Sequence, residues 1–238
     1  MEAAERAMKT IGIVGGTGPE STIDYYRLII AAYRERVPDG SYPSIIINSI
    51  DLKKATDLLT ANDLAGLAEL FVREVQTLDR AGAEVGLLAA NTPHIVFDEV
   101  ARQSLIPLVS IVEAACAEGK TLGLKKLGLL GTRFTMQGKF YPDVFSKEGI
   151  TLVTPEPDEQ AYIHEKYMGE LVPGVFLDET REQLLAIADR MKQREAIQGL
   201  ILAGTELPLL LRGATVSGVP FLDTAKIHVD AVLTRALA

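Results

Sequence analysis

Cysteine is almost absent from this chain of 238 residues, and its scarcity excludes two kinds of architecture. The single cysteine, Cys116, can form no intrachain disulfide and supplies no thiolate cluster for a metal. It stands among alanine and valine in a segment, Val112–Glu118, that is expected to be helical. We therefore interpret Cys116 as a small buried apolar residue and not as a catalytic nucleophile.

Long apolar runs and an excess of positive charge are also missing. Apolar residues make up 47% of the chain, but no run approaches the length that a membrane span needs. The first residues, Met1–Lys9, carry mixed charges, so we expect no signal peptide. Acidic residues outnumber basic ones by 32 to 24, and the net charge of −8 opposes binding to nucleic-acid phosphates. We expect a cytoplasmic protein that handles small molecules, without nucleic-acid or membrane partners.

The most informative stretch of the sequence is Val85–His94. It begins as a short apolar run and ends abruptly in small and polar residues, which is typical of a buried parallel strand that opens into a loop. Ligands of open α/β sheets sit at the carboxyl ends of the strands. We therefore expect Asn91, Thr92 and His94 to lie at a ligand site.

The same pattern returns further along the chain. The segment Gln198–Pro208 resembles Val85–Pro93, and Leu127–Thr132 resembles Ile11–Thr17. Two such similarities in the same order indicate an internal repeat, although buried strands also resemble one another by chance. A repeat predicts two half-domains that face each other across a cleft lined by strand ends.

Apolar strand patterns alternate with helical periodicity along the whole chain, which predicts an α/β fold with a parallel sheet in each half. The closing helix, which ends near Leu237, is expected to return to the first half. We therefore place the first domain at residues 1–108 and 220–238 and the second at residues 109–219. Further strands are expected at residues 44–47, 105–109, 151–153 and 220–222, and helices at residues 64–81, 163–171 and 179–194.

A glycine-rich loop, Gly15-Gly-Thr-Gly-Pro19, follows the first expected strand and precedes a helix. Backbone N–H groups at such a place suit an anion. No Lys-Ser/Thr pair follows, and the Gly-x-Gly-x-x-Gly spacing is absent, so a carboxylate is favoured over a nucleotide. We predict that Gly16 and Thr17 bind substrate; the alternative is a tight turn with a purely structural role.

Hydroxyl and amide side chains follow several of the strand ends and can donate hydrogen bonds to a carboxylate. Asn91 and Thr92 have a competing interpretation, in which they only form a turn that caps a helix. The predicted substrate-binding side chains are Asn91, Thr92, Thr132, Thr135 and Thr205.

Three residues are candidates for acid/base catalysis. Glu206 can act as a general base if burial raises its pKa, although such a carboxylate more often binds an amino group or a backbone N–H. His94 is an acid/base candidate whose commoner role is to cap or support a helix. Asp51 ends the second expected strand and is placed to reach the cleft.

Four motifs together resemble those of the aspartate/glutamate racemase family, in order and over almost the whole chain: Gly15–Thr22, Asn91–His94, Gly131–Met136 and Thr205–Pro208. The resemblance implies two pseudo-symmetric, Rossmann-like parallel-sheet domains with the site between them. It also implies a homodimer that needs neither pyridoxal phosphate nor a metal. In that family two residues flank the α-carbon of a small amino acid, and one removes the α-proton while the other returns a proton to the opposite face.

The sequence departs from the family at two positions. Members usually carry cysteine just before Asn-Thr and just before Thr-Glu, where this chain has Ala90 and Gly204. Neither residue has an ionisable group, and a threonine hydroxyl is far less acidic than a thiol with its pKa of ~8.5.

Three functions therefore stay open. The first is an isomerase of amino acids or related dicarboxylates that uses substitute groups. The second is a binding protein on the racemase scaffold that grips such a ligand without turnover, and the third is another isomerase or lyase acting on small carboxylates. No arginine stands clearly at a cleft-facing strand end, Arg133 being the nearest, so recognition of a side-chain carboxylate is not assured.

Overall fold

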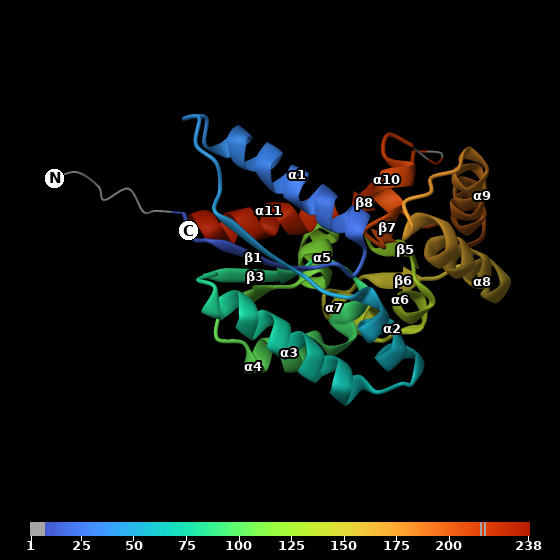
Figure 1. Cartoon of the computed structure of the whole chain (residues 1–238). Coiled ribbons are helices and arrows are strands. Elements are labelled where there is room, and N and C mark those ends of the chain that lie inside the picture. Colours follow the sequence, from blue (N-terminus) through green and yellow to red (C-terminus); the bar gives the residue numbers. More distant parts are fainter. Residues whose placement is uncertain (1–7, 215, 217) are drawn as a thin grey trace.

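The computed structural model describes residues 8–214, 216 and 218–238, which form two four-stranded sheets with helices on both faces (Figure 1). The first sheet contains β1 (Ile11–Gly15), β2 (Ile45–Ser49), β3 (Val85–Leu88) and β4 (Leu108–Val109). The second sheet contains β5 (Lys126–Gly131), β6 (Thr151–Val153), β7 (Gly199–Ala203) and β8 (Phe221–Asp223).

The two sheets have the same topology. Their strand orders are β2-β1-β3-β4 and β6-β5-β7-β8, and the pairings between these strands are parallel. The similar sequence pairs fall on β1 with β5 and on β3 with β7, which are the central strands of each sheet. The predicted α/β fold with two pseudo-symmetric parallel sheets is therefore confirmed.

Helices and helical turns connect the strands. They are α1 (Pro19–Arg36), α2 (Leu52–Thr60), α3 (Leu64–Arg80), η1 (Thr92–Val96), α4 (Phe97–Gln103), α5 (Ile111–Thr121), α6 (Arg133–Gln137), α7 (Phe140–Lys147), α8 (Pro157–Lys166), η2 (Tyr167–Leu171), α9 (Asp178–Glu195), α10 (Leu207–Leu211) and α11 (Thr224–Leu237).

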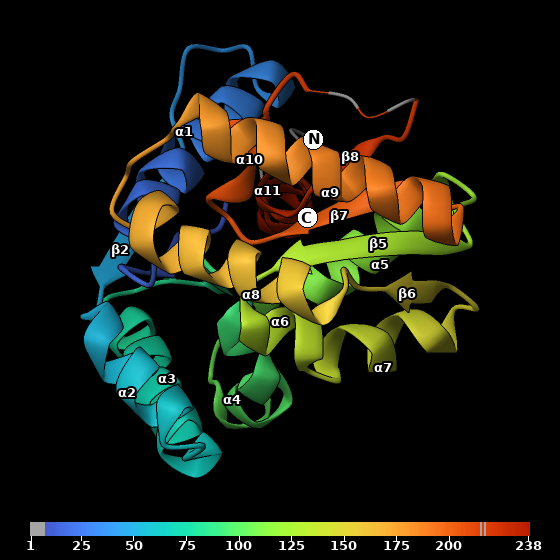
Figure 2. The ribbon, with the colours of Figure 1, turned by 90° about the vertical axis from the view of Figure 1, so that its right-hand side faces the viewer.

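Each sheet is buried on both faces because successive strand side chains point to opposite sides. In the first sheet, Ile13 and Leu87 pack beneath α1 and α11, whereas Val14 and Leu88 pack against α3. In the second sheet, Leu130 on β5 packs beneath α8 and α9, which Figure 2 shows on the near side. This burial explains why the central strands read as continuous apolar runs.

Two helices cross between the halves. Helix α5 follows β4 of the first sheet but packs on the second sheet, where Ile111 and Ala115 contact the cluster of Leu129 and Ile201. Helix α11 follows β8 of the second sheet but packs on the first, beside α1 and β1 (Figure 1). The expected return of the closing helix is thus observed, and α5 makes the equivalent exchange in the other direction.

The division into two domains stays a prediction, and one part of it differs from the strand pairing. Strand β8 pairs with β7, so residues 221–223 belong to the second sheet, although residues 220–238 were placed in the first domain. Residues 1–7, which were also placed in that domain and which include most of the Met1–Lys9 segment, lie outside the described residues.

Two local expectations also need correction. The strand expected over residues 105–109 forms only at Leu108–Val109, because Pro107 lacks the N–H that a ladder needs. Helix α2 was not predicted, although its apolar residues Leu52, Ala55, Leu58 and Leu59 recur at helical spacing. No helix in the described part of the chain is both long and apolar enough to cross a membrane.

Candidate active site

Strand ends from both halves line one small cavity of about 50 Å³. Ala90, which follows β3, and Gly204, which follows β7, both border it. These are the two positions at which the family resemblance expects cysteine, and the fold brings them to the same space. The predicted substrate-binding residues that line the cavity are Thr17, Asn91, Thr92 and Thr132.

Three threonine hydroxyls join the two halves beside this cavity. Thr92 Oγ1 lies 3.0 Å from Thr132 Oγ1 and 3.4 Å from Thr135 Oγ1, and the last two are 3.2 Å apart. Thr132 also caps α6, because its hydroxyl accepts a hydrogen bond from the Thr135 N–H. A hydroxyl both donates and accepts, so this cluster can turn its protons toward an incoming carboxylate.

Asn91 is fixed at both ends of its amide. Its nitrogen donates to Thr224 Oγ1 at 3.2 Å, and its oxygen accepts a hydrogen bond from the Tyr141 hydroxyl at 2.5 Å. The residue is buried and borders the cavity. These bonds hold the loop after β3 rigidly against the second half.

The glycine-rich loop is shaped by its backbone. Gly16 has a left-handed φ of 82°, and a β-carbon there would lie 2.2 Å from the Ile50 carbonyl oxygen, so only glycine fits. The Gly16 N–H donates to Thr22 Oγ1 at 2.9 Å, so this N–H is already bonded within the protein and is not free to bind a ligand. Of the two residues predicted to bind substrate here, only Thr17 lines the cavity.

Glu206 is buried directly behind the cavity, at the start of α10. Its Oε2 accepts hydrogen bonds from the Tyr167 hydroxyl and from Thr205 Oγ1, the latter at 3.2 Å. Thr205 thus bonds to Glu206 and is not among the residues that line the cavity. Burial raises the pKa of Glu206, whereas the two hydrogen bonds act in the opposite direction.

The second oxygen of Glu206 faces the other half of the molecule. Oε1 has no hydrogen-bond partner among the described residues, and a β-carbon on Gly18 would lie 1.9 Å from it. Gly18 directly precedes α1, so the carboxylate sits at the amino-terminal end of an 18-residue helix. The partial positive charge of that helix end favours the ionised carboxylate.

Tyr167 was not singled out by the sequence. It begins η2, a π-helical turn that continues α8, and its ring covers Gly204. A β-carbon on Gly204 would lie 2.4 Å from Tyr167 Cε2 and 2.9 Å from its hydroxyl oxygen. The phenol therefore fills the space that a side chain at position 204 would take. Turns of this π type are frequent at functional sites.

His94 does not belong to the cavity. Its Nε2 accepts a hydrogen bond from the Ile111 N–H at 3.1 Å, so its Nδ1 carries the proton and donates to the Ala90 carbonyl at 3.0 Å. The ring is stacked on Phe97. Burial lowers the pKa of His94 to about 3, so the ring is neutral. We therefore assign His94 to capping α5, and the geometry does not support a role in proton transfer.

Asp51 and Cys116 also lie away from the cavity. The Asp51 side chain is exposed and caps α2 by accepting a hydrogen bond from the Lys53 N–H at 2.9 Å. The candidate catalytic role of Asp51 is thus not supported by its position. Cys116 is buried under the second sheet, as its apolar neighbours indicated. Within residues 8–214, 216 and 218–238, no three His, Cys, Asp or Glu side chains are grouped to hold a metal ion.

A model of the Asp/Glu/hydantoin racemase family matches residues 14–232, which include the end of β1 and all of β2 to β8. The chain belongs to that family. A racemase-family fold explains why the strand ends of the two halves converge on one cavity.

Individual relatives extend the likeness. The chain is similar to an aspartate racemase homologue from Pyrococcus horikoshii, with 36% identity, a TM-score of 0.82 and coverage of 97% of this chain and 100% of that one. A structure described as a candidate Asp/Glu racemase from Yersinia pestis is 32% identical, with a TM-score of 0.86 and the same coverage. The broad specificity amino-acid racemase RacX of Bacillus subtilis is 27% identical over 158 residues, which cover 63% of this chain and 66% of that protein.

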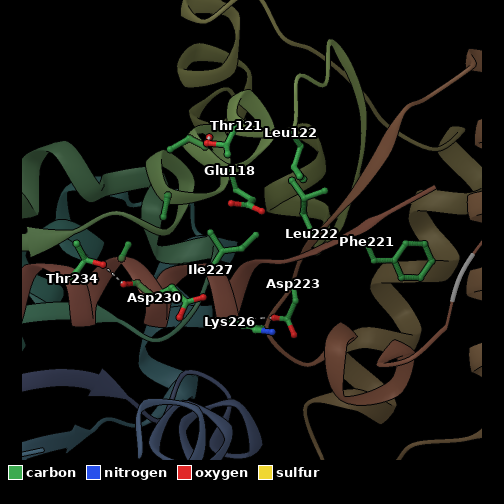
Figure 3. Close-up of a pocket in the computed structure, with 13 residues that line it drawn as sticks. Glu118, Thr121, Leu122, Phe221, Leu222, Asp223, Lys226, Ile227, Asp230 and Thr234 are labelled. Atoms are coloured by element: carbon green, nitrogen blue, oxygen red, sulfur yellow. Dashed lines mark hydrogen bonds between the residues drawn. The ribbon is translucent and has the colours of Figure 1, made fainter. Parts of the chain in front are cut away.

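A wider hollow in this racemase-family chain contains none of the predicted site residues. It has a volume of about 530 Å³ and lies between α5, α11 and β8, as the close-up in Figure 3 shows. The charged side chains at its wall are mostly acidic: Glu118, Asp223 and Asp230, with Lys226 between them. Its residues do not include the strand-end hydroxyls that suit a carboxylate, so the small cavity is the better candidate site.

Proposed function

We propose that this racemase-family protein binds a small amino acid between its two halves and exchanges the α-proton through an acid/base system centred on Glu206. The observation that carries the proposal is the buried Glu206 carboxylate, held behind the Gly204 side of the cavity by Tyr167 and Thr205. A carboxylate whose pKa is raised by burial is a stronger base than a solvated one. It replaces the thiol that the family resemblance expects at position 204.

The threonine hydroxyls are the proposed site of the α-carboxylate. Thr92 and Thr132 face the cavity from opposite halves and are 3.0 Å apart, so one carboxylate can bond to both. Thr135 supports them from behind through its own hydroxyl. Charge that develops on the carboxylate as the α-proton leaves is stabilised by these donors.

The remaining wall favours an uncharged side chain on the ligand. It is formed largely by Leu52, Ala55, Leu59, Phe134, Met168 and Val172. Among the described residues that line the cavity there is no lysine or arginine. Burying a side-chain carboxylate against such a wall is costly, because no partner charge compensates for its lost hydration. We therefore favour apolar amino acids over aspartate, glutamate and other dicarboxylates.

The cavity of about 50 Å³ is small for this purpose. Ligand pockets commonly measure ~300 Å³ or more. The two halves, or α2 and η2 at the rim, therefore separate to admit the ligand. We further expect a cytoplasmic location, from the composition, and a homodimer, as the family resemblance implies. Sedimentation velocity of the purified protein tests the dimer directly.

A second function, ligand binding without turnover, is favoured by one specific observation. The Ala90 side of the cavity presents alanine, threonine and asparagine, and among the described residues it carries no titratable group. A protein that lacks one of two proton-transferring groups can retain affinity for the ligand after losing the reaction.

The two functions are separated by exchange of the α-proton with solvent deuterium. Purified protein is incubated in D₂O with a panel of L- and D-amino acids, and loss of the α-proton signal is followed by NMR. The proposed enzyme exchanges the proton, and Glu206→Gln abolishes exchange, while Glu195→Gln at a surface ion pair does not. Thermal stabilisation by an amino acid without any exchange refutes the enzyme and leaves the binding protein.

A further inference from the structure

One titratable side chain reaches the cavity. Among the described residues that line it, Tyr167 alone has a side chain that ionises, whereas Glu206 lies behind and is absent from the lining. The Tyr167 hydroxyl donates a hydrogen bond to Glu206 Oε2. A proton that passes between the cavity and the carboxylate therefore has to pass through the phenol.

The position of the hydroxyl is informative. Its oxygen lies 2.9 Å from the place where a β-carbon on Gly204 would be, so the hydroxyl lies beside the space that a side chain at that position would enter. The resemblance to racemases expects a thiol at the same position. Tyr167, carried by a different element, thus presents an O–H group close to where the family presents an S–H group.

Glu206 is arranged to accept the phenolic proton. Its Oε2 already receives the Tyr167 hydroxyl, and its unpartnered Oε1 is turned to the amino-terminal end of α1. Both side chains are buried, so bulk water does not compete for the bond between them. From the cavity inward, the groups therefore lie in the order Tyr167 phenol, Glu206 carboxylate and amino-terminal end of α1.

Among the described residues, the opposite wall of the cavity has no ionisable side chain equivalent to Tyr167. Ala90 carries no proton donor, and the hydroxyls of Thr92 and Thr132 bond to each other. The nearest imidazole there, His94, is bonded through both ring nitrogens to backbone groups. Among the described residues that line the cavity, a carbanion can therefore receive a proton from an ionisable side chain on one face only.

On the basis of the proposed function, we infer that Tyr167 is the catalytic residue that exchanges a proton with the α-carbon, that Glu206 acts through it, and that exchange occurs with retention of configuration. The Cα–H bond breaks and its proton forms a bond to the Tyr167 oxygen, while the phenolic proton moves to Glu206 Oε2. The electron pair of the Cα–H bond remains on the ligand, delocalised into the carboxylate held by the threonines. The reverse steps return a proton or a solvent deuteron to the same face.

The test compares exchange with inversion for alanine, valine, leucine and methionine of both configurations. Exchange is measured by NMR in D₂O, and inversion by chiral chromatography of the same samples. Wild-type protein should exchange at least about tenfold faster than it inverts, because general acid/base assistance is available on only one face. Tyr167→Phe should slow exchange about 100-fold or more, the usual contribution of a positioned acid/base group. Tyr162→Phe on the neighbouring turn of α8, whose ring contacts Lys166 outside the cavity, should leave exchange unchanged.

A second variant restores a group on the empty face. Ala90→Cys should raise the ratio of inversion to exchange by about tenfold or more, because a thiol there can return the proton to the other side. Ligand-induced thermal shifts of each variant show that the site is folded and still binds.

The outcomes separate this inference from the function on which it rests. Absence of exchange in the wild-type protein refutes both. Exchange in the wild type that persists in folded, ligand-binding Tyr167→Phe leaves the proposed function and refutes the role of Tyr167. Inversion as fast as exchange in the wild type, or an unchanged ratio in folded Ala90→Cys, refutes the one-faced transfer.

Discussion

Replacing Gly204 by cysteine should destabilise the protein, even though the resemblance to racemases expects cysteine there. The new β-carbon would lie 2.4 Å from Tyr167 Cε2, which is far closer than two carbon atoms approach in proteins. The ring cannot move away freely, because it is buried and its hydroxyl is held by Glu206. Overpacking of this kind costs about 1–3 kcal/mol. A ring that shifts also deprives a buried carboxylate of its donor, which costs about 1–3 kcal/mol more.

The compensating change should restore much of this loss. Tyr167→Ala alone leaves a cavity and an unsatisfied Glu206, at a cost of about 3–5 kcal/mol. In the double variant the thiol enters the space that the phenol has left. We expect the double variant to be more stable than the sum of the two single changes predicts, by about 1–3 kcal/mol, as is common for residues in direct contact.

The assay is urea-induced unfolding of the purified variants, followed by circular dichroism, with the midpoint and slope reported for each. Gly169→Ala is the matched control, because it lies on the same turn as Tyr167 and no atom beyond its own helical turn lies within 4 Å of its added carbon. This control should be neutral or should stabilise the helix by about 0.5–1 kcal/mol. If Gly204→Cys is as stable as the wild-type protein, the ring does not occupy this space. The same conclusion follows if the losses of stability in the two single variants simply add up in the double variant.

Three further predictions concern stability and the lone thiol. Burial lowers the pKa of His94 to about 3 and that of His228 to about 4 in the folded protein. The unfolded chain, with histidine pKa values of ~6.5, therefore binds these protons first, and stability should fall below pH ~6.5 by about 1.4 kcal/mol per pH unit for each histidine. His94→Gln should reduce that slope in urea unfolding between pH 7 and 5, and an unchanged slope contradicts the assignment. Arg212→Gln removes the partner of Asp24, whose carboxylate is nearly buried while the arginine is half exposed. We expect the free energy of unfolding to fall by about 1–2 kcal/mol in the same assay. An unchanged free energy of unfolding would mean that solvent screens the pair. Cys116→Ser should leave α-proton exchange intact, because the thiol lies under the second sheet, and a large loss of exchange in a folded variant contradicts that placement.

The central strands and the threonine loops were predictable because their signals are local. An apolar run that stops in small and polar residues marks a strand end, and its repetition in each half places two such ends opposite each other. The racemase motifs gave the same arrangement independently. The repeat matches Thr92 with Thr205, whereas in the structure the hydroxyl that Thr92 meets from the other half is that of Thr132.

The role of Tyr167 was not predictable from the same signals. Periodicity over residues 163–171 indicates a helix with one charged face, but it does not show that the ring of Tyr167 closes over Gly204. The absent side chain at Gly204 was itself a signal, because a glycine at a strand end often marks close approach by another group. Asp51 was misplaced for a different reason: it precedes α2 and caps it, and this helix was not recognised.

Helices α5 and α11 each pack on the sheet of the opposite half, and this arrangement has a consequence for unfolding. Each sheet has one face that a helix from the other half helps to cover. A fragment that ends after α5 would therefore leave part of the apolar side of β1 and β3, the part under α11, open to water. Melting of the two sheets should therefore be a single cooperative event. By the same reasoning, two identical chains of half this length would cover their sheets fully only if each packed its last helix on the sheet of the other chain.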